Sequence, residues 1–280
     1  MTASTLRTVT VRAHAKLTLA LRITGVRDDG YHLIDAEMVS LDLHDLISLT
    51  PGGSGITASG PFCDGMPLDD TNLVVRAMRL ADASEDTDVG SDVRGDAGVH
   101  LDKRIPHGGG LGGGSTDAAA VLRWRGYSSS PSDLERASLL GADIPFCLVG
   151  GRARVRGIGE TIDPLPHLDR IVTLVIPPLT VSTPAAYRAW DDLGGPVADG
   201  PNDLEPAALV VEPELRRWRD LIADRVGVAP VLAGSGATWF VDGERANALD
   251  DLVDEGARVV VARTVPVDVA ANRTAPDAPA

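Results

Sequence analysis

The chain has 280 residues, 44% of them hydrophobic and 24% charged, which is long enough for one large domain or two ordinary ones with their own cores. The formal net charge of −14 excludes non-specific nucleic-acid binding, which needs a basic face. No apolar run is long enough to span a bilayer, and the amino terminus lacks the apolar core of a signal peptide, so we expect a cytoplasmic protein without membrane contact.

The first third of the chain is predicted to combine strands with one helix. Residues 8–23 alternate polar and apolar over two strand lengths, and residues 46–50 form a further strand. Turn residues dominate 25–32 between them. Residues 71–83 have helical spacing, with Thr71 or Asn72 as the N-cap.

An acidic, glycine-rich segment, residues 84–98, is expected to form a solvated loop. Residues 99–105 then predict a strand that runs into a glycine-rich loop. The following helix, 115–124, could be capped by Ser115 or Thr116, and Asp117 would favour its positive end. A second short helix is expected over 130–141, and residues 142–157 lead back into a strand.

The second half repeats the alternation of strands and helices. Strands are predicted at 171–177, 229–243 and 257–265, and helical segments at 182–190 and 202–224. Because strands also occur in adjacent pairs, the fold class is α+β rather than a doubly wound sheet. The pattern breaks at 164–170, so we expect one domain over 1–163, a second over 164–267 and a disordered tail over 268–280.

The segment PHGGGLGGGSTDAAAVL, residues 106–122, packs six glycines ahead of a helix. Such a turn can bind an anion, because it presents unpaired backbone N–H groups and the positive end of a helix dipole. A P-loop would need a lysine before its Ser/Thr, but Gly114 is followed directly by Ser115. Gly108, Gly110 and Gly113 match a dinucleotide fingerprint by letter, but the acidic residue about twenty positions on begins a helix pattern instead of ending a strand.

Pro106, the glycines, Leu111 and Ser115 resemble the ATP loop of the GHMP kinases. Four more segments resemble one branch of that superfamily, the 4-diphosphocytidyl-2-C-methyl-D-erythritol kinases: residues 13–49 with G-Y-H, L-G-A-D-I-P at 140–145, N-D-L-E-P at 202–206 and G-S-G-A-T at 234–238. The resemblance extends to about residue 262. It implies a two-domain GHMP kinase architecture, with an ATP-binding and catalytic domain first, a substrate-binding domain second and the active site in the cleft between them.

Lysine is rare here: of 26 basic residues only Lys16 and Lys103 are not arginine. A compact ammonium cannot be replaced by a guanidinium, which argues for a role. Lys16 also lies in an alternating apolar strand, where a lysine is unexpected unless it is paired or functional. The resemblance places the family's catalytic lysine at Lys16 and its catalytic aspartate at Asp143. We expect Asp143 to accept the proton of the substrate hydroxyl, while Lys16 keeps Asp143 ionised and stabilises the alkoxide.

The resemblance implies ATP as the phosphate donor, together with Mg²⁺. The hydroxyl of Ser115 is a candidate oxygen ligand for that ion. The expected ATP-binding residues are Pro106, His107, Gly108, Gly109, Gly110, Leu111, Gly112, Gly113, Gly114, Ser115, Thr116, Lys103 and Asn72.

Aromatic faces stack on bases, and Tyr31 and His32 match the family's G-Y-H motif at the cytidine end. Tyr187 is the candidate for the second face of the base, although a helix residue at the edge of the core explains it nearly as well. Gly234 and Ser235 would donate backbone N–H groups to the substrate diphosphate, and a plain hairpin turn explains them about as well.

Two departures from the family accompany these matches. Thr18 replaces the family's asparagine two residues after the lysine, which should alter contact with the substrate without abolishing it. The stretch from Ser115 to Asp143 is a few residues shorter than usual, which either shortens a helix or shifts Asp143.

The sequence predicts a cytoplasmic kinase that phosphorylates the C2 hydroxyl of a cytidyl diphosphate substrate in non-mevalonate isoprenoid biosynthesis. Its partner would be that small molecule rather than a nucleic acid or membrane, and the chain would be a monomer or weak homodimer. Two alternatives remain: another GHMP kinase for a sugar, homoserine or mevalonate-type alcohol, and a catalytically inactive nucleotide-binding sensor of the same fold.

Overall fold

The computed structural model describes residues 7–83, 96–106 and 108–267. The strands form two separate sheets. The larger has the order β3-β4-β2-β5-β6, with β1 paired along β2, and the smaller has the order β10-β7-β9-β8. Strand bounds in the larger sheet are β1 Val9–Val26, β2 His32–Pro51, β3 Ile56–Ser59, β4 Ala97–Asp102, β5 Arg152–Gly157 and β6 Thr161–Pro164. In the smaller sheet they are β7 Ile171–Ile176, β8 Val231–Leu232, β9 Trp239–Asp242 and β10 Arg258–Arg263.

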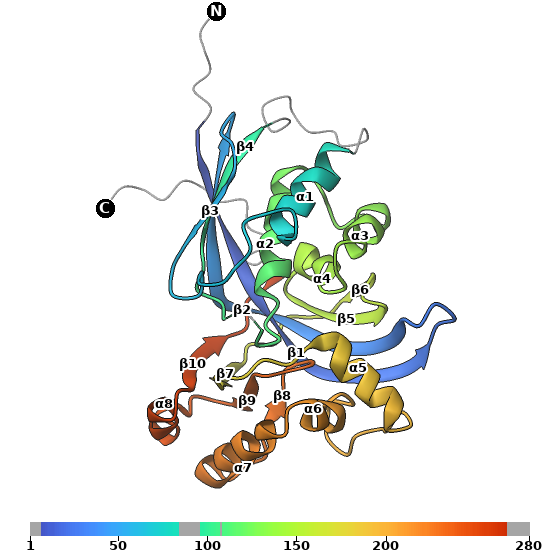
Figure 1. The fold of residues 1–280 in the computed structure, drawn as a ribbon, viewed down its shortest axis with the longest axis vertical. Coiled ribbons are helices and arrows are strands. Elements are labelled where there is room, and N and C mark those ends of the chain that lie inside the picture. Colours follow the sequence, from blue (N-terminus) through green and yellow to red (C-terminus); the bar gives the residue numbers. More distant parts are fainter. Residues whose placement is uncertain (1–6, 84–95, 107, 268–280) are drawn as a thin grey trace, which may run out of the picture.

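Four helices cover one face of the larger sheet, and the remaining helices lie at the smaller sheet and at the end of the β1–β2 hairpin (Figure 1). The first group comprises α1 Leu73–Asp82, α2 Gly113–Trp124, α3 Pro131–Ser138 and α4 Ile144–Val149. The second comprises α5 Thr183–Asp192, α6 Glu205–Val211, α7 Glu214–Val226, the 3₁₀ helix η2 Ala246–Ala248 and α8 Asp251–Asp254. The α+β prediction is confirmed. No helix in the described ranges is long and apolar enough to cross a membrane.

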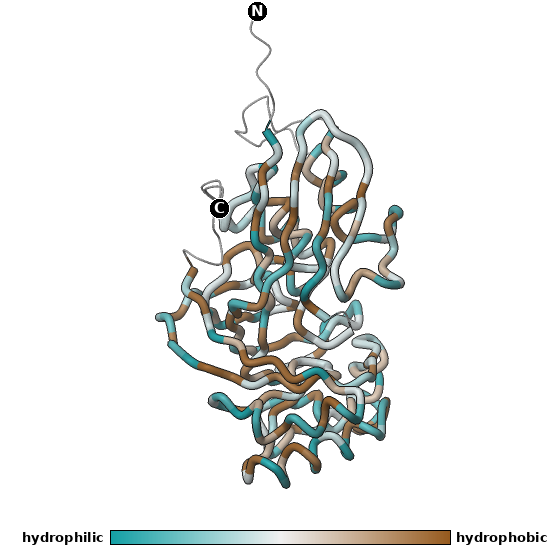
Figure 2. The backbone as a smooth tube through the Cα atoms, turned by 90° about the vertical axis from the view of Figure 1, so that its left-hand side faces the viewer, coloured by the Kyte–Doolittle hydropathy of each residue, from teal (hydrophilic) through white to brown (hydrophobic). Residues whose placement is uncertain are grey.

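The two sheets are joined through the middle of β1 and β2. Ala15, Leu17 and Leu41 of these strands pack with Leu174 and Phe240 of the smaller sheet in one buried cluster. In Figure 2 apolar segments gather along these central strands, and hydrophilic segments lie mostly on outer turns and helix faces. The strand that carries the predicted catalytic lysine is therefore held from both sides by apolar packing.

The sheets divide the chain between Pro164 and Ile171, at the stretch where the sequence pattern breaks. The helices do not follow that division. Trp190 of α5, Ala207 of α6 and Leu204 at the N-cap of α6 are buried in the core cluster of the larger sheet. Helices of the second half thus pack against the first half, which places a wall of the cavity described below.

Several predicted elements need correction. β1 is one continuous strand of 18 residues, and β2 has 20 residues where only 46–50 was expected. Residues 142–157 contain the helix α4 before β5. The prediction missed this helix because a continuous apolar run does not distinguish helix from strand. The segment 202–224 contains two helices, α6 and α7, and Pro213 is the N-cap of the second.

Helix caps give one confirmation and one correction. Asn72 caps α1 and accepts a hydrogen bond from the backbone N–H of Val74 at 2.8 Å. The cap predicted at Ser115 or Thr116 is wrong, because α2 already begins at Gly113 and its N-cap is Gly112. Of the predicted acidic loop, 97–98 belong to β4, while 84–95 and the predicted tail 268–280 lie outside the described residues.

Candidate active site

A cavity of about 540 Å³ lies where the β1–β2 hairpin, the glycine loop, α5 and the turn after β8 meet. Its walls come from segments far apart in the sequence. They include ten of the predicted site residues: Lys16, Thr18, Tyr31, His32, Gly110, Ser115, Asp143, Tyr187, Gly234 and Ser235. The folded chain thus brings the predicted catalytic pair, part of the ATP loop and the aromatic residues to one space.

Lys16 and Asp143 form an ion pair at the centre of this cavity. Lys16 Nζ lies 3.2 Å from Asp143 Oδ2 and donates to Thr18 Oγ1 at 3.3 Å. Lys16 is only 5% exposed. Asp143 immediately precedes α4. The shorter segment between Ser115 and Asp143 therefore does not separate the two charged groups.

The pairing of β1 with β2 explains why the Lys16 side chain faces the cavity. Its register shifts between His14 and Lys16, and again between Thr18 and Ala20. Such bulges twist a strand and redirect side chains. The three residues from Lys16 to Thr18 therefore form a short segment with its own register, and it presents both polar side chains to the cavity.

The glycine loop is packed between β1 and the turn after β8. The backbone N–H of Lys16 donates to the carbonyl of Leu111 at 3.0 Å. A Cβ at Gly112, where φ is +70°, would lie 2.7 Å from Lys16 Cγ. A Cβ at Gly110, where φ is +77°, would lie 2.3 Å from the carbonyl oxygen of Ala233. Both positions exclude a side chain, by conformation and by close approach.

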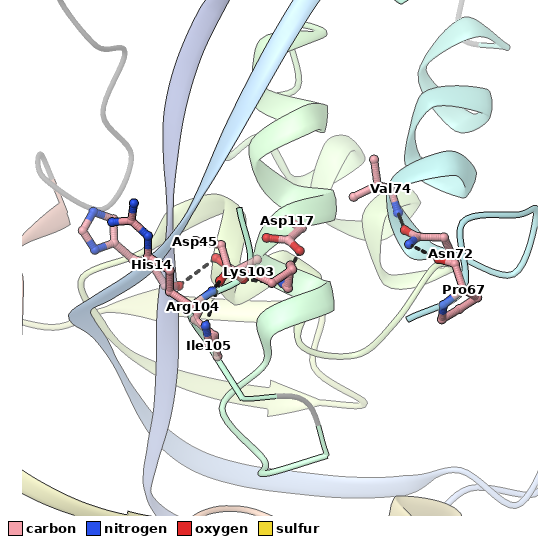
Figure 3. Close-up of polar contacts among 10 residues, drawn as sticks. His14, Asp45, Pro67, Asn72, Val74, Lys103, Arg104, Ile105 and Asp117 are labelled. Atoms are coloured by element: carbon pink, nitrogen blue, oxygen red, sulfur yellow. Dashed lines mark hydrogen bonds and ion pairs between the residues drawn. The ribbon is translucent and has the colours of Figure 1, made fainter. Parts of the chain in front are cut away.

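Lys103 lies between two buried carboxylates beside a smaller cavity of about 190 Å³ (Figure 3). Its Nζ donates to Asp45 and to Asp117. Burial raises the pKa of Asp117 to about 8, although Lys103 and its hydrogen bond oppose the rise. Asp45 also accepts from the backbone N–H of Ile105 at 2.8 Å. This triad joins β2, the end of β4 and α2 directly ahead of the glycine loop.

Asn72, Gly113 and Gly114 line the same smaller cavity as Lys103. Asn72 uses its side-chain amide to cap α1 and to donate to Pro67 at 2.7 Å (Figure 3). The sequence did not point to Asp45, and it pointed to Asp117 only as a residue at the positive end of a helix, not as a partner of Lys103. The signal available was a charged residue in an apolar strand and another within an alanine-rich helix.

The other predicted ATP-binding residues do not line either cavity, or lie outside the described residues. Thr116 needs a correction: it is 1% exposed and its hydroxyl donates to the carbonyl of His14 at 2.7 Å, inside the core. His107 lies outside the described residues. The remaining loop residues pack the loop without lining either cavity, and they are Pro106, Gly108, Gly109, Leu111 and Gly112.

Aromatic side chains gather at the other end of the main cavity. The ring of His32 lies 4.7 Å from that of Tyr187, and its edge meets Trp190 at 5.6 Å. His32 Nε2 donates to Asp191 Oδ1 at 2.8 Å. Tyr31 is 58% exposed. The faces of His32 and Tyr187 that touch cover each other, whereas Tyr31, which lines the same cavity, keeps much of its ring exposed.

Tyr187 also connects this aromatic end to the Lys16–Asp143 pair. Burial raises the pKa of its hydroxyl, and the negative charge of Asp143 adds to the rise. The sequence singled out Tyr187 but not Trp190 or Asp191, which lie three and four residues further along α5, respectively. Their shared helix face was the available signal, since residues three and four apart are neighbours.

The family model described as GHMP kinases N terminal domain matches residues 72–151. The chain is 38% identical over 247 residues to the 4-diphosphocytidyl-2-C-methyl-D-erythritol kinase of Paracoccus denitrificans, covering 81% of this chain and 84% of that protein. It is 36% identical to the enzyme of the same name from Ruegeria pomeroyi, covering 81% of this chain and 86% of that one.

Solved structures show the same relationship. A crystal structure of 4-(cytidine 5'-diphospho)-2C-methyl-D-erythritol kinase matches with a TM-score of 0.69 and 29% identity, covering 91% of this chain and 98% of that one. A mevalonate kinase matches with a TM-score of 0.60 at 12% identity, covering 93% and 99%, which shows the shared fold.

Proposed function

The chain belongs to the family of 4-diphosphocytidyl-2-C-methyl-D-erythritol kinases, and from this membership we propose that it transfers the γ-phosphoryl group of ATP to the C2 hydroxyl of the cytidyl substrate. The observation that carries the proposal is the Lys16–Asp143 pair at 3.2 Å, in one cavity with Ser115 of the ATP loop and with Tyr31. A cytidine-binding end distinguishes this reaction from those of sugar, homoserine or mevalonate-type kinases.

Phosphoryl transfer needs positioning and neutralisation of charge more than covalent chemistry from the protein. In the proposed mechanism the substrate hydroxyl donates its proton to the Asp143 carboxylate as its oxygen attacks the γ-phosphorus. The bond from that phosphorus to the bridging β–γ oxygen breaks, and ADP leaves. The Lys16 ammonium is held between Asp143 and Thr18 Oγ1, so it neutralises the alkoxide as charge develops there. The N-terminus of α2, which carries Ser115, points free backbone N–H groups at the phosphates.

Mg²⁺ fits this donor set as an ion carried by ATP. In the described ranges no three His, Cys, Asp or Glu side chains gather into a metal centre. Mg²⁺ at kinase sites keeps several waters and is held largely by substrate phosphates, so few protein ligands are needed. The Ser115 hydroxyl at the cavity wall would be one of them. When bound, the ion offsets charge on the β- and γ-phosphate oxygens.

A coupled assay of ADP release tests the proposal. We expect turnover with the cytidyl substrate, and none with galactose, homoserine or mevalonate. Turnover with one of those alcohols instead would make the chain a different GHMP kinase, and ADP release with none of the four would favour an inactive sensor. We further propose that the protein is cytoplasmic and that it is a monomer or weak homodimer. Size-exclusion chromatography across a concentration series would test the oligomeric state.

A further inference from the structure

The N-D-L-E-P stretch takes no part in the mechanism above, yet its first side chain is buried beside the cavity. Asn202 is 1% exposed. Its Nδ2 donates to the carbonyl of Leu232 at 2.9 Å and to that of Gly234 at 2.7 Å. Its Oδ1 accepts from the backbone N–H of Leu204 at 3.0 Å. Both side-chain donors of Asn202 therefore hold the segment that leads into the turn after β8.

The backbone on either side of Asn202 is fastened to β1. The N–H of Leu21 donates to the carbonyl of Pro201 at 2.8 Å, and the N–H of Asp203 donates to the carbonyl of Leu21 at 2.9 Å. The Asp203 carboxylate accepts from the backbone N–H of Ile23 at 3.0 Å. Asn202 therefore spans from the catalytic strand to the turn.

That turn touches both the catalytic lysine and the ATP loop. A Cβ at Gly234 would lie 3.6 Å from both Lys16 Nζ and Thr18 Oγ1. The carbonyl of Ala233 lies against Gly110 so closely that no side chain fits there. A displacement of the turn would therefore disturb both the surroundings of the Lys16 ammonium and the packing of the loop at Gly110.

We propose that Asn202 is a positioning residue for phosphoryl transfer: it holds the carbonyls of Leu232 and Gly234 from the β1 side and so keeps the turn in place against the Lys16 ammonium and against Gly110 of the ATP loop. Only a side chain with two donors on one atom and an acceptor on the other satisfies all three of its partners. The kinetic part of this inference rests on the proposed function of the site. The structural part does not.

The kinetic test is Asn202→Asp, with Asn247→Asp as the matched control, because Asn247 is exposed in η2. An ionised carboxylate at 202 would face two carbonyl oxygens. At pH 8 we expect kcat to fall about 100-fold, the effect of a displacement of about 1 Å, with both KM values changed by less than about 3-fold. Asn247→Asp should match the wild type.

Lowering the pH separates positioning from loss of fold. Burial raises the pKa of a carboxyl group, and its protonated form donates one hydrogen bond. At pH 5.5 the deficit of Asn202→Asp relative to wild type should therefore shrink about 10-fold. Asn202→Ala, which has no donor at any pH, should keep its deficit, and it serves as the kinetic variant if Asn202→Asp does not fold. A loss of kcat without this recovery, or wild-type kcat in Asn202→Ala, would overturn the inference.

Amide hydrogen exchange tests the turn without any substrate. The N–H of Ala233 donates to Thr238 and that of Gly236 to Ala233. We expect both amides to exchange at least about 10-fold faster in Asn202→Ala than in the wild type, at one pH, because their turn is released. Unchanged exchange would refute the structural part. If the wild type proves inactive with the cytidyl substrate, the proposed function fails while this measurement still decides the role of Asn202.

Discussion

Replacing Lys16 by arginine tests whether the transfer needs a compact cation or only a positive charge. The ammonium lies 3.2 Å from Asp143 Oδ2 and 3.3 Å from Thr18 Oγ1. The side chain is only 6% exposed, and its stem packs so closely against Gly112 that the loop has no room there for one extra carbon. A planar guanidinium is larger, so arginine must move either its own charge or the glycine loop.

The cost follows from the charge separation. At 3.2 Å and an effective dielectric constant of about 20, the attraction between the Lys16 and Asp143 charges is about 5 kcal/mol. Moving the charge centre away by about 2 Å reduces it to about 3 kcal/mol. If the developing alkoxide loses a similar amount, kcat falls about 30-fold. Lys16→Met, which keeps the stem and removes the charge, should fall on the order of 1000-fold, as for loss of a donor to a developing oxyanion.

The assay is coupled ADP release with saturating ATP and cytidyl substrate, and each variant is first checked by its thermal melting curve. Arg12→Lys is the control. Arg12 is an exposed residue of the same strand, and this substitution exchanges the same two residue types. Lys16→Arg with kcat within 3-fold of the wild type would refute the reasoning, since charge alone would then be sufficient. Equal activity of the arginine and methionine variants would also refute the ranking by charge position.

Three further predictions concern the loop, the aromatic end and stability. Gly112→Ala should lower kcat at least 10-fold and the free energy of unfolding by about 1–3 kcal/mol, because φ is +70° and the new Cβ would meet the lysine stem at 2.7 Å. Kinetics and urea unfolding measure the two effects, and Gly114→Ala, with 3.5 Å of clearance, is the control for both. Tyr187→Ala should raise KM for the cytidyl substrate about 10-fold and leave KM for ATP unchanged, because it removes a stacking surface worth about 1–3 kcal/mol; equal changes in both KM values would contradict this. Burial lowers the pKa of His14 from 6.5 to about 4, so the unfolded chain takes up the proton first as the pH falls. Its contribution is fully present above pH 6.5 and about 3 kcal/mol is lost by pH 4, and urea unfolding of His14→Gln should lack that part of the loss.

The Lys16–Asp143 pair was recognisable as a candidate catalytic pair because short motifs contain both residues. Lys16 stood out as a charge in an apolar strand, and Asp143 was assigned its proposed role from the L-G-A-D-I-P segment. Their contact at 3.2 Å depends on the bulges that redirect β1, which no local pattern reports.

The extent of β2 was not predictable from alternation alone. The strand contains Asp42, His44 and Asp45, and these polar residues interrupt the apolar period before 46–50. Asp45 is fully buried because Lys103 meets it there, although 58 positions separate the two residues in the chain. A partner so distant in sequence is visible only after folding. Without it, a charged residue in a strand predicts a break.

The glycines of the ATP loop have two separate physical reasons, and substitution distinguishes them. An alanine keeps the backbone N–H, so a role in donating to phosphate does not by itself require glycine. Gly110 and Gly112 require it because the backbone is left-handed there and the carbonyl of Ala233 and the stem of Lys16 approach within 3 Å of the missing Cβ. Gly114 has neither constraint. The constrained glycines therefore place Lys16, the proposed catalytic lysine, and the turn held by Asn202 against the loop, and their variants should lower kcat before they weaken ATP binding.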